Sequence, residues 1–322
     1  MRAPDFWRHD GVAARLLAPL GWLWSWGVDR RLAETEAWRA AVPVICVGNI
    51  VAGGAGKTPV ALALAERLKA RGRAVAMLSR GHGGSEVGPR RVDPLRHDAA
   101  RVGDEPLLLA RAAPTWVARW RPDGAVAATE AGAEVIVMDD GFQNPTLAKD
   151  LSLVVVDGGY GFGNGRVIPA GPCREPVAKG LARADAVVLI GDDTAGAARF
   201  LAGTPVLRAR LAPGPEAAAL AGKPVVAFAG IGRPEKFFAT LEQVGARLVA
   251  AHPFADHHPY SRAEIEEIVA DAAEAGAVAV TTEKDLVRVP EDLRPRITAL
   301  TVRLEWEDTR ALDHLLDRAV PG

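Results

Sequence analysis

The chain has 322 residues, of which 49% are hydrophobic and 25% are charged, and its formal net charge is −1. These values are typical of a folded protein with about two domains, and they exclude a disordered chain or a polytopic membrane protein. The balanced charge predicts no nucleic-acid partner, because such binding relies on a positive field. The only two cysteines, Cys46 and Cys173, exclude a framework of disulfides and favour a reducing compartment.

Residues 1–40 form the first predicted unit, and they contain five of the eight tryptophans. The run from Leu16 to Val28 carries no charge and would span about 20 Å as a helix, too short for a bilayer core of about 30 Å. Tryptophan favours the headgroup region of a membrane. We therefore expect a helix that lies in a membrane interface; the alternative is a helix packed on the protein's own core. The arginines expected to face lipid phosphates are Arg2, Arg8, Arg15, Arg30 and Arg31.

Residues 41–215 form the second predicted unit, in which buried strands alternate with helices. Continuous apolar runs predict strands that are buried on both faces, and apolar residues at helical spacing predict a helix over Thr58–Arg71. The pattern indicates an α/β fold: a P-loop NTPase-like, mostly parallel sheet with helices on both faces. The predicted strands are Pro43–Ile50, Ala74–Ser79, Glu134–Asp139, Leu151–Asp157 and Asp185–Gly191.

Residues 216–322 form a smaller predicted α/β domain, whose last helix is free to pack back on the first. A stretch rich in proline, glycine and alanine, Leu211–Pro224, fits a linker or an entry loop. A strand begins at Pro224, and a shorter strand–helix alternation follows it. The expected helices are Glu235–Val244, Arg262–Ala275 and Thr309–Ala319, and the expected strands are Arg247–Ala251, Val278–Thr281 and Ile297–Leu304.

The strongest motif is a glycine-rich loop between the first predicted strand and the first helix. Its glycines let backbone N–H groups turn toward phosphate oxygens, and the helix N-terminus adds its positive dipole. In this pattern Lys57 reaches the β- and γ-phosphates and Thr58 is a ligand of Mg²⁺. One departure is Val51, which stands where the full pattern has glycine. The expected nucleotide-binding residues are Val51, Ala52, Gly53, Gly54, Ala55, Gly56, Lys57 and Thr58.

A phosphate-binding loop of this kind needs an acidic partner for the metal at the end of a neighbouring strand. Four apolar residues, Val135 to Met138, lead directly into Asp139 and Asp140. We expect one of these two carboxylates to bind Mg²⁺ directly and leave open which one. The alternative is that both carboxylates only cap the strand end.

Two further clusters suggest chemistry beyond nucleotide binding. Asp104 and Glu105 open a predicted helix, where carboxylates also serve as ordinary caps, but transfer of a phosphoryl group to an alcohol needs an acceptor for the hydroxyl proton. His257 and His258 follow Asp256 just after a strand. A histidine oriented by a carboxylate suits proton transfer better than a zinc site, which needs three or four convergent ligands. A solvated polar loop is the remaining interpretation.

The ordered set of motifs resembles the tetraacyldisaccharide 4′-kinase family of Gram-negative bacteria. The motifs cover the chain from the N-terminal helix to about residue 285. Asn144 departs from the family pattern, which usually has histidine after DDGFQ. In chain order the motifs are VGN…GGxGKTP (Val47–Pro59), SRG (Ser79–Gly81), GDEP (Gly103–Pro106), DDGFQ (Asp139–Gln143), PAGPCREP (Pro169–Pro176), DHHPY (Asp256–Tyr260) and TEKD (Thr282–Asp285).

The resemblance implies transfer of the γ-phosphate of ATP to the 4′-hydroxyl of a tetraacyldisaccharide 1-phosphate in lipid A biosynthesis, at the cytoplasmic face of the inner membrane. It implies Asp104 as the base and His257 as its support from the second domain. It implies no obligate protein partner. Carried over by motif, the remaining roles are Lys57 on the phosphates, Thr58, Asp139 and Asp140 for Mg²⁺, and Arg80, Glu105 and Arg174 for contacts with the substrate.

Two other classes of protein share part of this pattern. An ATP-dependent ligase acting on a soluble acid would need no tryptophan-rich N-terminus. A nucleotide-switched ATPase at the membrane would have no base for an acceptor hydroxyl. Dependence of ATP turnover on a lipid disaccharide separates both from a lipid kinase.

Overall fold

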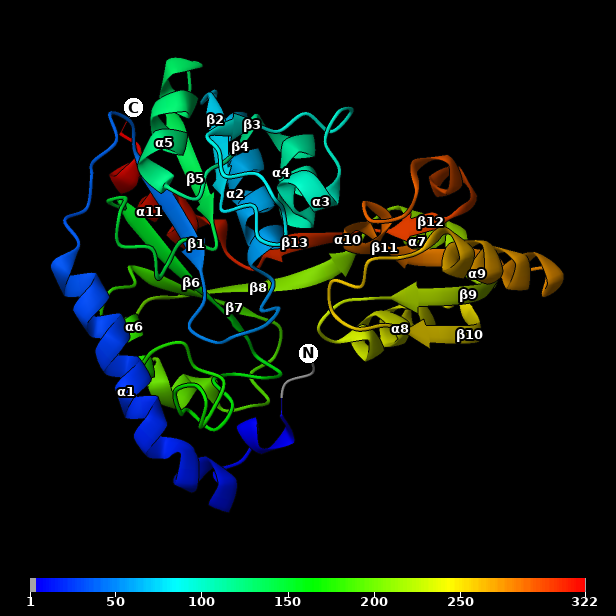
Figure 1. Cartoon of the computed structure of the whole chain (residues 1–322), viewed down its shortest axis with the longest axis horizontal. Helices are drawn as coiled ribbons and strands as arrows, with labels where there is room; N and C mark the ends of the chain where they lie inside the picture. The colour runs from blue at the N-terminus through cyan, green and yellow to red at the C-terminus, as the bar shows by residue number, and fades with distance from the viewer. Residues whose placement is uncertain (1–3, 322) are drawn as a thin grey trace.

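The computed structural model of the chain describes residues 4–321, so Arg2 lies outside the described residues. Within that range the strands form two separate sheets, one of nine strands and one of four (Figure 1). The large sheet contains β1 at its centre, and the small sheet lies beyond the end of β8. The expected combination of a larger and a smaller α/β part, preceded by an N-terminal helix, is confirmed.

The large sheet has the strand order β13-β8-β7-β6-β1-β5-β2-β4-β3. All strands from β8 to β4 run parallel, and only the edge strands β13 and β3 are antiparallel to their neighbours. The expectation of a mostly parallel sheet is therefore confirmed. The strands are β1 (Val44–Gly48), β2 (Val75–Ser79), β3 (Arg90–Arg91), β4 (Thr115–Val117), β5 (Val135–Asp139), β6 (Leu151–Asp157), β7 (Ala186–Ile190), β8 (Val206–Pro213) and β13 (Val302–Trp306).

Helices cover both faces of the large sheet. The chain moves toward the β3 edge of the sheet through α2 and α4, and toward the β13 edge through α5 and α6. Because such crossovers are right-handed, the two pairs of helices lie on opposite faces. The helices in chain order are η1 (Asp5–Trp7), α1 (Val12–Glu34), α2 (Lys57–Ala70), α3 (Ala99–Val102), α4 (Asp104–Ala112), α5 (Arg121–Glu130), α6 (Val177–Leu181), η2 (Ala197–Phe200), α7 (Glu216–Leu220), α8 (Pro234–Gln243), α9 (Arg262–Glu274), α10 (Glu283–Leu286), η3 (Glu291–Arg296) and α11 (Thr309–Ala319).

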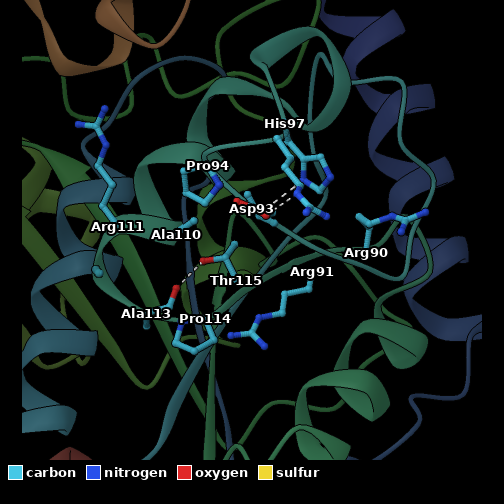
Figure 2. Close-up of a pocket in the computed structure, with 13 residues that line it drawn as sticks. Arg90, Arg91, Asp93, Pro94, His97, Ala110, Arg111, Ala113, Pro114 and Thr115 are labelled. Atoms are coloured by element: carbon cyan, nitrogen blue, oxygen red, sulfur yellow. Dashed lines mark hydrogen bonds and ion pairs between the residues drawn. The ribbon is translucent and has the colours of Figure 1, made fainter.

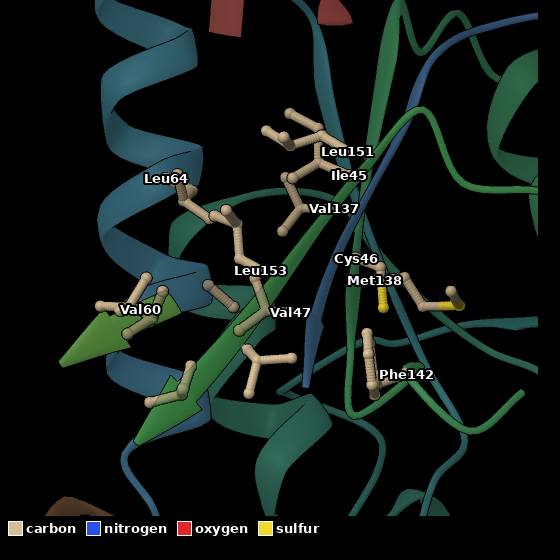
Figure 3. Packing of buried hydrophobic residues seen from close by; sticks show 14 of the residues in the cluster. Ile45, Cys46, Val47, Val60, Leu64, Val137, Met138, Phe142, Leu151 and Leu153 are labelled. Carbon is tan, nitrogen blue, oxygen red and sulfur yellow. The ribbon is translucent and has the colours of Figure 1, made fainter. Parts of the chain in front are cut away.

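The main core lies between the central strands and their helices. Because successive side chains of a strand point to opposite faces, Ile45 and Val47 face Leu64 of α2, while Cys46 and Met138 lie on the other side of the sheet (Figure 3). All five side chains are fully shielded from solvent. This buried centre fixes the ends of β1 and β5, from which the candidate site is built.

The small sheet has the order β10-β9-β11-β12, with every pair parallel. Its strands are β9 (Pro224–Ala229), β10 (Arg247–Pro253), β11 (Val278–Thr282) and β12 (Thr298–Leu300). In Figure 1 the arrows of β9 and β10 point toward the large sheet. The loops that follow these strands therefore lie at the junction between the two sheets.

Two expectations for the C-terminal third are wrong in detail. The expected strand Ile297–Leu304 is two strands, because the chain leaves β12 at Leu300 and then joins β8 of the large sheet as β13. The expected linker Leu211–Pro224 contains the end of β8 and all of α7. The last helix, α11, buries Leu312 and Leu316 in the main core. The division of the chain at residues 40 and 215 stays a prediction.

Helix α1 runs along the outside of the molecule and packs on it with one narrow stripe (Figure 1). Ala14 and Gly21 are buried, and a Cβ on Gly21 would lie 3.0 Å from the carbonyl oxygen of Val167. The opposite side exposes Leu16, Leu23 and other large apolar side chains. No helix among residues 4–321 is apolar over a length that would cross a membrane. The helix thus packs on the core and also presents an apolar outer face.

Candidate active site

The glycine-rich loop leaves the C-terminal end of β1 and enters α2, at the centre of the large sheet. Gly56, the residue before α2, has φ +86°, a left-handed conformation that glycine adopts without a steric penalty. Lys57 then begins the helix. The N–H of Ala52 donates to the carbonyl of Pro172, so this backbone group already has a partner within the protein.

Asp139 ends β5, the neighbour of β1, and its side chain meets Thr58 of α2. The Thr58 hydroxyl donates to Oδ2 of Asp139 across 3.1 Å. Oδ1 of Asp139 is buried and has no hydrogen-bond partner in the described structure. Burial raises the pKa of Asp139 to about 7, and Lys57 opposes that rise. An unpartnered carboxylate oxygen beside a hydroxyl is a donor set that suits Mg²⁺.

Asp140 lies among cations instead. Its carboxylate accepts from Nη1 of Arg174 at 3.0 Å, and its Oδ1 lies 3.7 Å from Nζ of Lys57. Burial acts to raise the pKa of Asp140, but Lys57 and Arg174 lower it below its usual value. Asp140 also has φ +50°, which is uncommon for a residue with a side chain. The two adjacent carboxylates therefore differ: Asp140 is ionised and paired, whereas Asp139 keeps one oxygen free.

Asp104 and His257, which are 153 residues apart in sequence, meet at the junction of the two sheets. Asp104 begins α4 and is 4% exposed, and its Oδ2 lies 3.0 Å from Nδ1 of His257. Burial alone would raise the pKa of Asp104, but the hydrogen bond from His257 and the charge of Lys284 lower it. The hydrogen bond to Asp104 raises the pKa of His257. The pair is therefore an ionised carboxylate with an imidazole donor.

The histidine loop itself is held in one conformation. His257 has φ +58°, and its N–H donates to the carbonyl of Gly230. The neighbouring His258 turns away, because its Nε2 lies 3.0 Å from Glu264 and its ring stacks on Phe254. Only one ring of the adjacent pair therefore faces Asp104. A non-glycine residue in this backbone region is often found where the surrounding structure fixes a functional side chain.

The three residues expected to contact the substrate lie in different surroundings. Arg80 follows β2 and is exposed. Glu105 pairs with Lys284, whose Nζ lies 2.7 Å from its carboxylate. Arg174 binds Asp140 and Gln143 through its guanidinium. Arg80 is thus the freest of the three, while the other two charges already have partners.

The residue that departs from the family pattern, Asn144, has a local structural role. Its side-chain oxygen accepts from the N–H and the hydroxyl of Thr146, at 3.2 and 3.0 Å. This is a turn stabilised by a side chain. The preceding Gln143 donates to the carbonyl of Asn49 and to Glu175, which ties the loop to the site.

Some charged groups of the site had no signal in the sequence reasoning. Arg121 is 2% exposed at the start of α5, and burial together with nearby Arg80 lowers its pKa to about 10. Arg233, from the loop before α8, donates to Asp157 at the end of β6 and to the carbonyl of Gly54 in the glycine-rich loop. No motif or spacing indicates such contacts, because they depend on how the two sheets approach.

A groove of about 690 Å³ lies elsewhere, along β3 and the start of β4. Figure 2 shows Arg90, Arg91 and Arg111 around it, with His97 accepting a hydrogen bond from the N–H of Asp93. None of the residues predicted for the site lines it. The predicted site residues therefore lie at the strand ends and not in this groove.

Comparison with known proteins assigns nearly the whole chain to one family. The profile of the family described as tetraacyldisaccharide-1-P 4′-kinase matches residues 13–321. The chain belongs to the tetraacyldisaccharide 4′-kinase family. It is 65% identical over 320 residues to the tetraacyldisaccharide 4′-kinase of Paramagnetospirillum magneticum, covering 99% of this chain and 98% of that protein. The enzyme of the same name from Rhodospirillum rubrum is 58% identical over 327 residues, covering 100% and 99%.

A solved structure supports the same assignment. LpxK from Aquifex aeolicus, crystallised in complex with ATP, superposes on this chain with a TM-score of 0.79 at 28% identity. The match covers 95% of this chain and 99% of that chain. The resemblance inferred from the ordered motifs is thus confirmed for family and fold. Membership of this family does not favour the two alternatives, an ATP-dependent ligase and a nucleotide-switched ATPase.

Proposed function

We propose that this tetraacyldisaccharide 4′-kinase binds ATP at the glycine-rich loop and uses the Asp104–His257 pair to accept the proton of the 4′-hydroxyl. The observation that carries the proposal is the 3.0 Å contact between Asp104 and His257, which joins the core to the second sheet beside a phosphate-binding loop. The support for ATP is the loop itself together with the ATP-bound relative. The acceptor is the tetraacyldisaccharide 1-phosphate that the family description names.

In the proposed reaction the 4′-oxygen forms a bond to the γ-phosphorus while the bond from that phosphorus to the bridging oxygen breaks. ADP leaves, and the hydroxyl proton passes to Asp104, whose carboxylate His257 orients through Nδ1. Lys57 balances the charge on the phosphate oxygens. Thr58 and Asp139 would hold Mg²⁺, because a free buried carboxylate oxygen adjoins the hydroxyl; the ion would neutralise charge on the β- and γ-phosphates.

The test of this function is incubation of the full chain with ATP, MgCl₂ and tetraacyldisaccharide 1-phosphate in detergent micelles, followed by mass analysis of the lipid. We expect a lipid product with one added phosphoryl group and an equal amount of ADP. Release of inorganic phosphate without a modified lipid would contradict the kinase and support the nucleotide switch. A disaccharide whose 4′-hydroxyl is replaced by hydrogen is the matched control, which should give no product.

We also propose that α1 holds the enzyme on the inner leaflet of a bacterial inner membrane, at its cytoplasmic face. The outer face of the helix supports this, because Leu16 is 75% exposed, Leu23 66% and Trp26 62%, and Arg15 and Arg30 are exposed beside them. An apolar stripe flanked by arginines fits the headgroup region of an anionic bilayer. The acyl chains of the substrate would remain in that bilayer while the sugar enters the site.

Replacement of Leu16, Leu23 and Trp26 by serine removes three of the large apolar side chains from this outer face and spares the buried stripe. In a flotation assay we expect the variant no longer to float with anionic phospholipid vesicles, while its affinity for ATP is unchanged. High salt should weaken the binding of the unmodified chain only in part, because apolar burial is not screened.

A matched triple variant keeps the number of lost apolar side chains constant. Val87, Leu95 and Val249 are exposed on other elements, and their replacement by serine should leave vesicle binding intact. Equal flotation of the helix variant and this control would contradict the assignment of α1.

A further inference from the structure

The TEKD motif, Thr282–Asp285, has no role in the mechanism so far, although it lies at the junction of the two sheets. Asp285 is fully buried and anchors the motif, since it accepts from the N–H of Gly230 and from the hydroxyl of Tyr260. The side chain of Thr282 caps α10 by accepting from the N–H of Asp285. The backbone around Lys284 is therefore fixed from both sides.

Lys284 projects from this rigid turn into the Asp104–His257 pair. Its Nζ lies 2.7 Å from a carboxylate oxygen of Glu105, 3.2 Å from Nε2 of His257 and 3.9 Å from Oδ2 of Asp104. An ammonium has three N–H donors and no acceptor, so it donates in each short contact. Nε2 of His257 must then be the acceptor, which requires that this nitrogen carries no proton.

The same three side chains have the spacing of a possible metal site. Ligand atoms of Asp104, Glu105 and His257 all lie within 4.8 Å of one another. The ammonium of Lys284 lies among these atoms, at hydrogen-bond distance from two of the residues. The cluster therefore already contains an internal cation, which neutralises the carboxylates in the way that a metal ion otherwise would.

We propose that Lys284 is a positioning residue that holds His257 in the tautomer with its proton on Nδ1, directed at Asp104, and keeps Nε2 unprotonated. The proposal rests on the proposed role of the Asp104–His257 pair and deepens it. Within residues 4–321, no other group forms a hydrogen bond to Nε2 of His257. Without the ammonium, His257 would gain a second proton more readily, and its hydrogen bond with Asp104 would become an ion pair that weakens the carboxylate as a base.

The charges around His257 come from several elements, and they act in opposite directions. Asp104 and Glu105 approach from α4, and Oδ1 of Asp256 lies 3.8 Å from Nε2 in the same loop. Lys284 approaches from α10, Arg288 lies 3.6 Å from Asp104 just after α10, and the ring of His82 meets His257 edge-on at 6.0 Å. The hydrogen bond that His257 donates to Asp104 raises the pKa of His257, while burial and the charge of Lys284 lower it. Loss of Lys284 should therefore raise the pKa of His257.

The first test uses NMR titration of the full chain labelled at histidine, with Lys284→Met, Lys284→Arg and Glu105→Gln variants. In Lys284→Met we expect the pKa of His257 to rise by about one unit, because one nearby cation is lost. Lys284→Arg should restore the original value, and Glu105→Gln should shift it the opposite way, because an anion is lost. Lys69→Met, on the last turn of α2, removes the same charge at a distance and should cause no shift.

The second test is the pH dependence of kcat/KM for the disaccharide, which reports the ionisation of groups in the free enzyme. In Lys284→Met we expect the acidic limb of this profile to move to higher pH by the same amount as the pKa of His257. The value of kcat/KM should recover at alkaline pH. Lys284→Arg should have the same profile as the unmodified enzyme. A purely structural role would lower the rate at every pH and leave the limb in place, which would overturn the proposal.

Failure of the proposed function is separate from failure of this inference. If the unmodified chain phosphorylates no disaccharide, the function is wrong, and the NMR titration still decides whether Lys284 controls His257. If the kinase is active but Lys284→Met leaves both the pKa of His257 and the acidic limb unchanged, the inference is wrong. The Lys284→Arg variant, whose chain keeps the cation, guards against a loss of folding in Lys284→Met.

Discussion

The two halves of the candidate site are built in different ways. Thr58 and Lys57 come from α2, which follows β1, and Asp139 ends β5, which pairs with β1 in the large sheet. Asp104 meets His257 and Lys284 only because a second sheet lies against the first. The first half is fixed by the core around the large sheet, whereas the second depends on how the two sheets lie against each other. Variants should therefore affect the two halves differently: one through phosphate binding, the other through proton transfer and the approach of the two sheets.

The largest effect is expected at the junction of the two sheets. Asp104→Ala and His257→Ala should each slow phosphoryl transfer by about 10²–10⁴-fold, the usual value of a general base. Because the two side chains share one hydrogen bond, the double variant should be little slower than the slower single variant. Single-turnover rates measure this, with ATP affinity measured separately and expected to stay the same in all three variants.

The double-variant cycle also tests the histidine assignment. His258→Ala is the matched control, because His258 contacts Glu264 instead of Asp104. It should reduce the rate far less than His257→Ala. Losses that multiply fully between Asp104→Ala and His257→Ala would mean that the two side chains act independently and not as one unit.

The next loss is expected in the half of the site that is built on the large sheet. Lys57→Ala should lower kcat by at least about 10²-fold, comparable to the loss of one preorganised donor to the developing charge. Lys57 is 13% exposed on its side chain and lies 3.7 Å from Asp140, so its charge is poorly screened. Lys69→Ala, on the same helix, is the control. Near-normal kinase activity of Lys57→Ala would contradict the assignment of the phosphate-binding loop.

The same division explains what sequence reasoning could predict. Strand ends of a parallel sheet meet at one edge, so a motif after β1 and an acidic pair after β5 can be assigned to one site from pattern alone. The order of motifs was also enough to identify the family. The contacts that sequence reasoning missed come from longer-range packing: Arg174 on Asp140, Lys284 beside His257, and Arg233 on the glycine-rich loop.

The error over Ile297–Leu304 has the same physical origin. Both β12 and β13 are apolar enough for a strand, and no residue between them signals that the chain changes sheet. Only the partners reveal it, since β12 pairs with β11 and β13 pairs with β8. A one-dimensional pattern records which residues form strands, whereas the pairing depends on the rest of the chain.

A weaker contact joins the two halves directly at the glycine-rich loop. Arg233 donates to Asp157 and to the carbonyl of Gly54, and its guanidinium lies 5.7 Å from the centre of the Tyr160 ring. We expect Arg233→Ala to raise the KM for ATP by up to about tenfold, the value of one partly buried charged hydrogen bond, with a smaller change in kcat. Lys236 also binds the carboxylate of Asp157, but its side chain is 55% exposed. Lys236→Ala should therefore raise the KM for ATP less than Arg233→Ala does.

The smallest expected effect concerns how this contact responds to pH. Burial acts to raise the pKa of Asp157, but Lys236 and Arg233 hold it below its usual value near 3.9. A carboxylate whose pKa is lowered on folding contributes stability that is fully present above its unfolded pKa and is lost as the pH falls through its folded pKa. The difference in Tm between the unmodified chain and Asp157→Asn should therefore be constant near neutral pH and shrink below about pH 4.

Asp313→Asn separates this contact from an ion pair between two helices that pack on the main core. Asp313 of α11 pairs with Arg67 of α2, and that pairing also lowers its pKa. Both variants should lose their difference in Tm at acidic pH, because the linkage argument applies to each. Only Asp157→Asn should also raise the KM for ATP at neutral pH, since only Asp157 holds a side chain that contacts the glycine-rich loop. An equal rise in KM for Asp313→Asn would mean that ATP binding responds to general stability, and the second sheet would then have no specific part in holding the nucleotide.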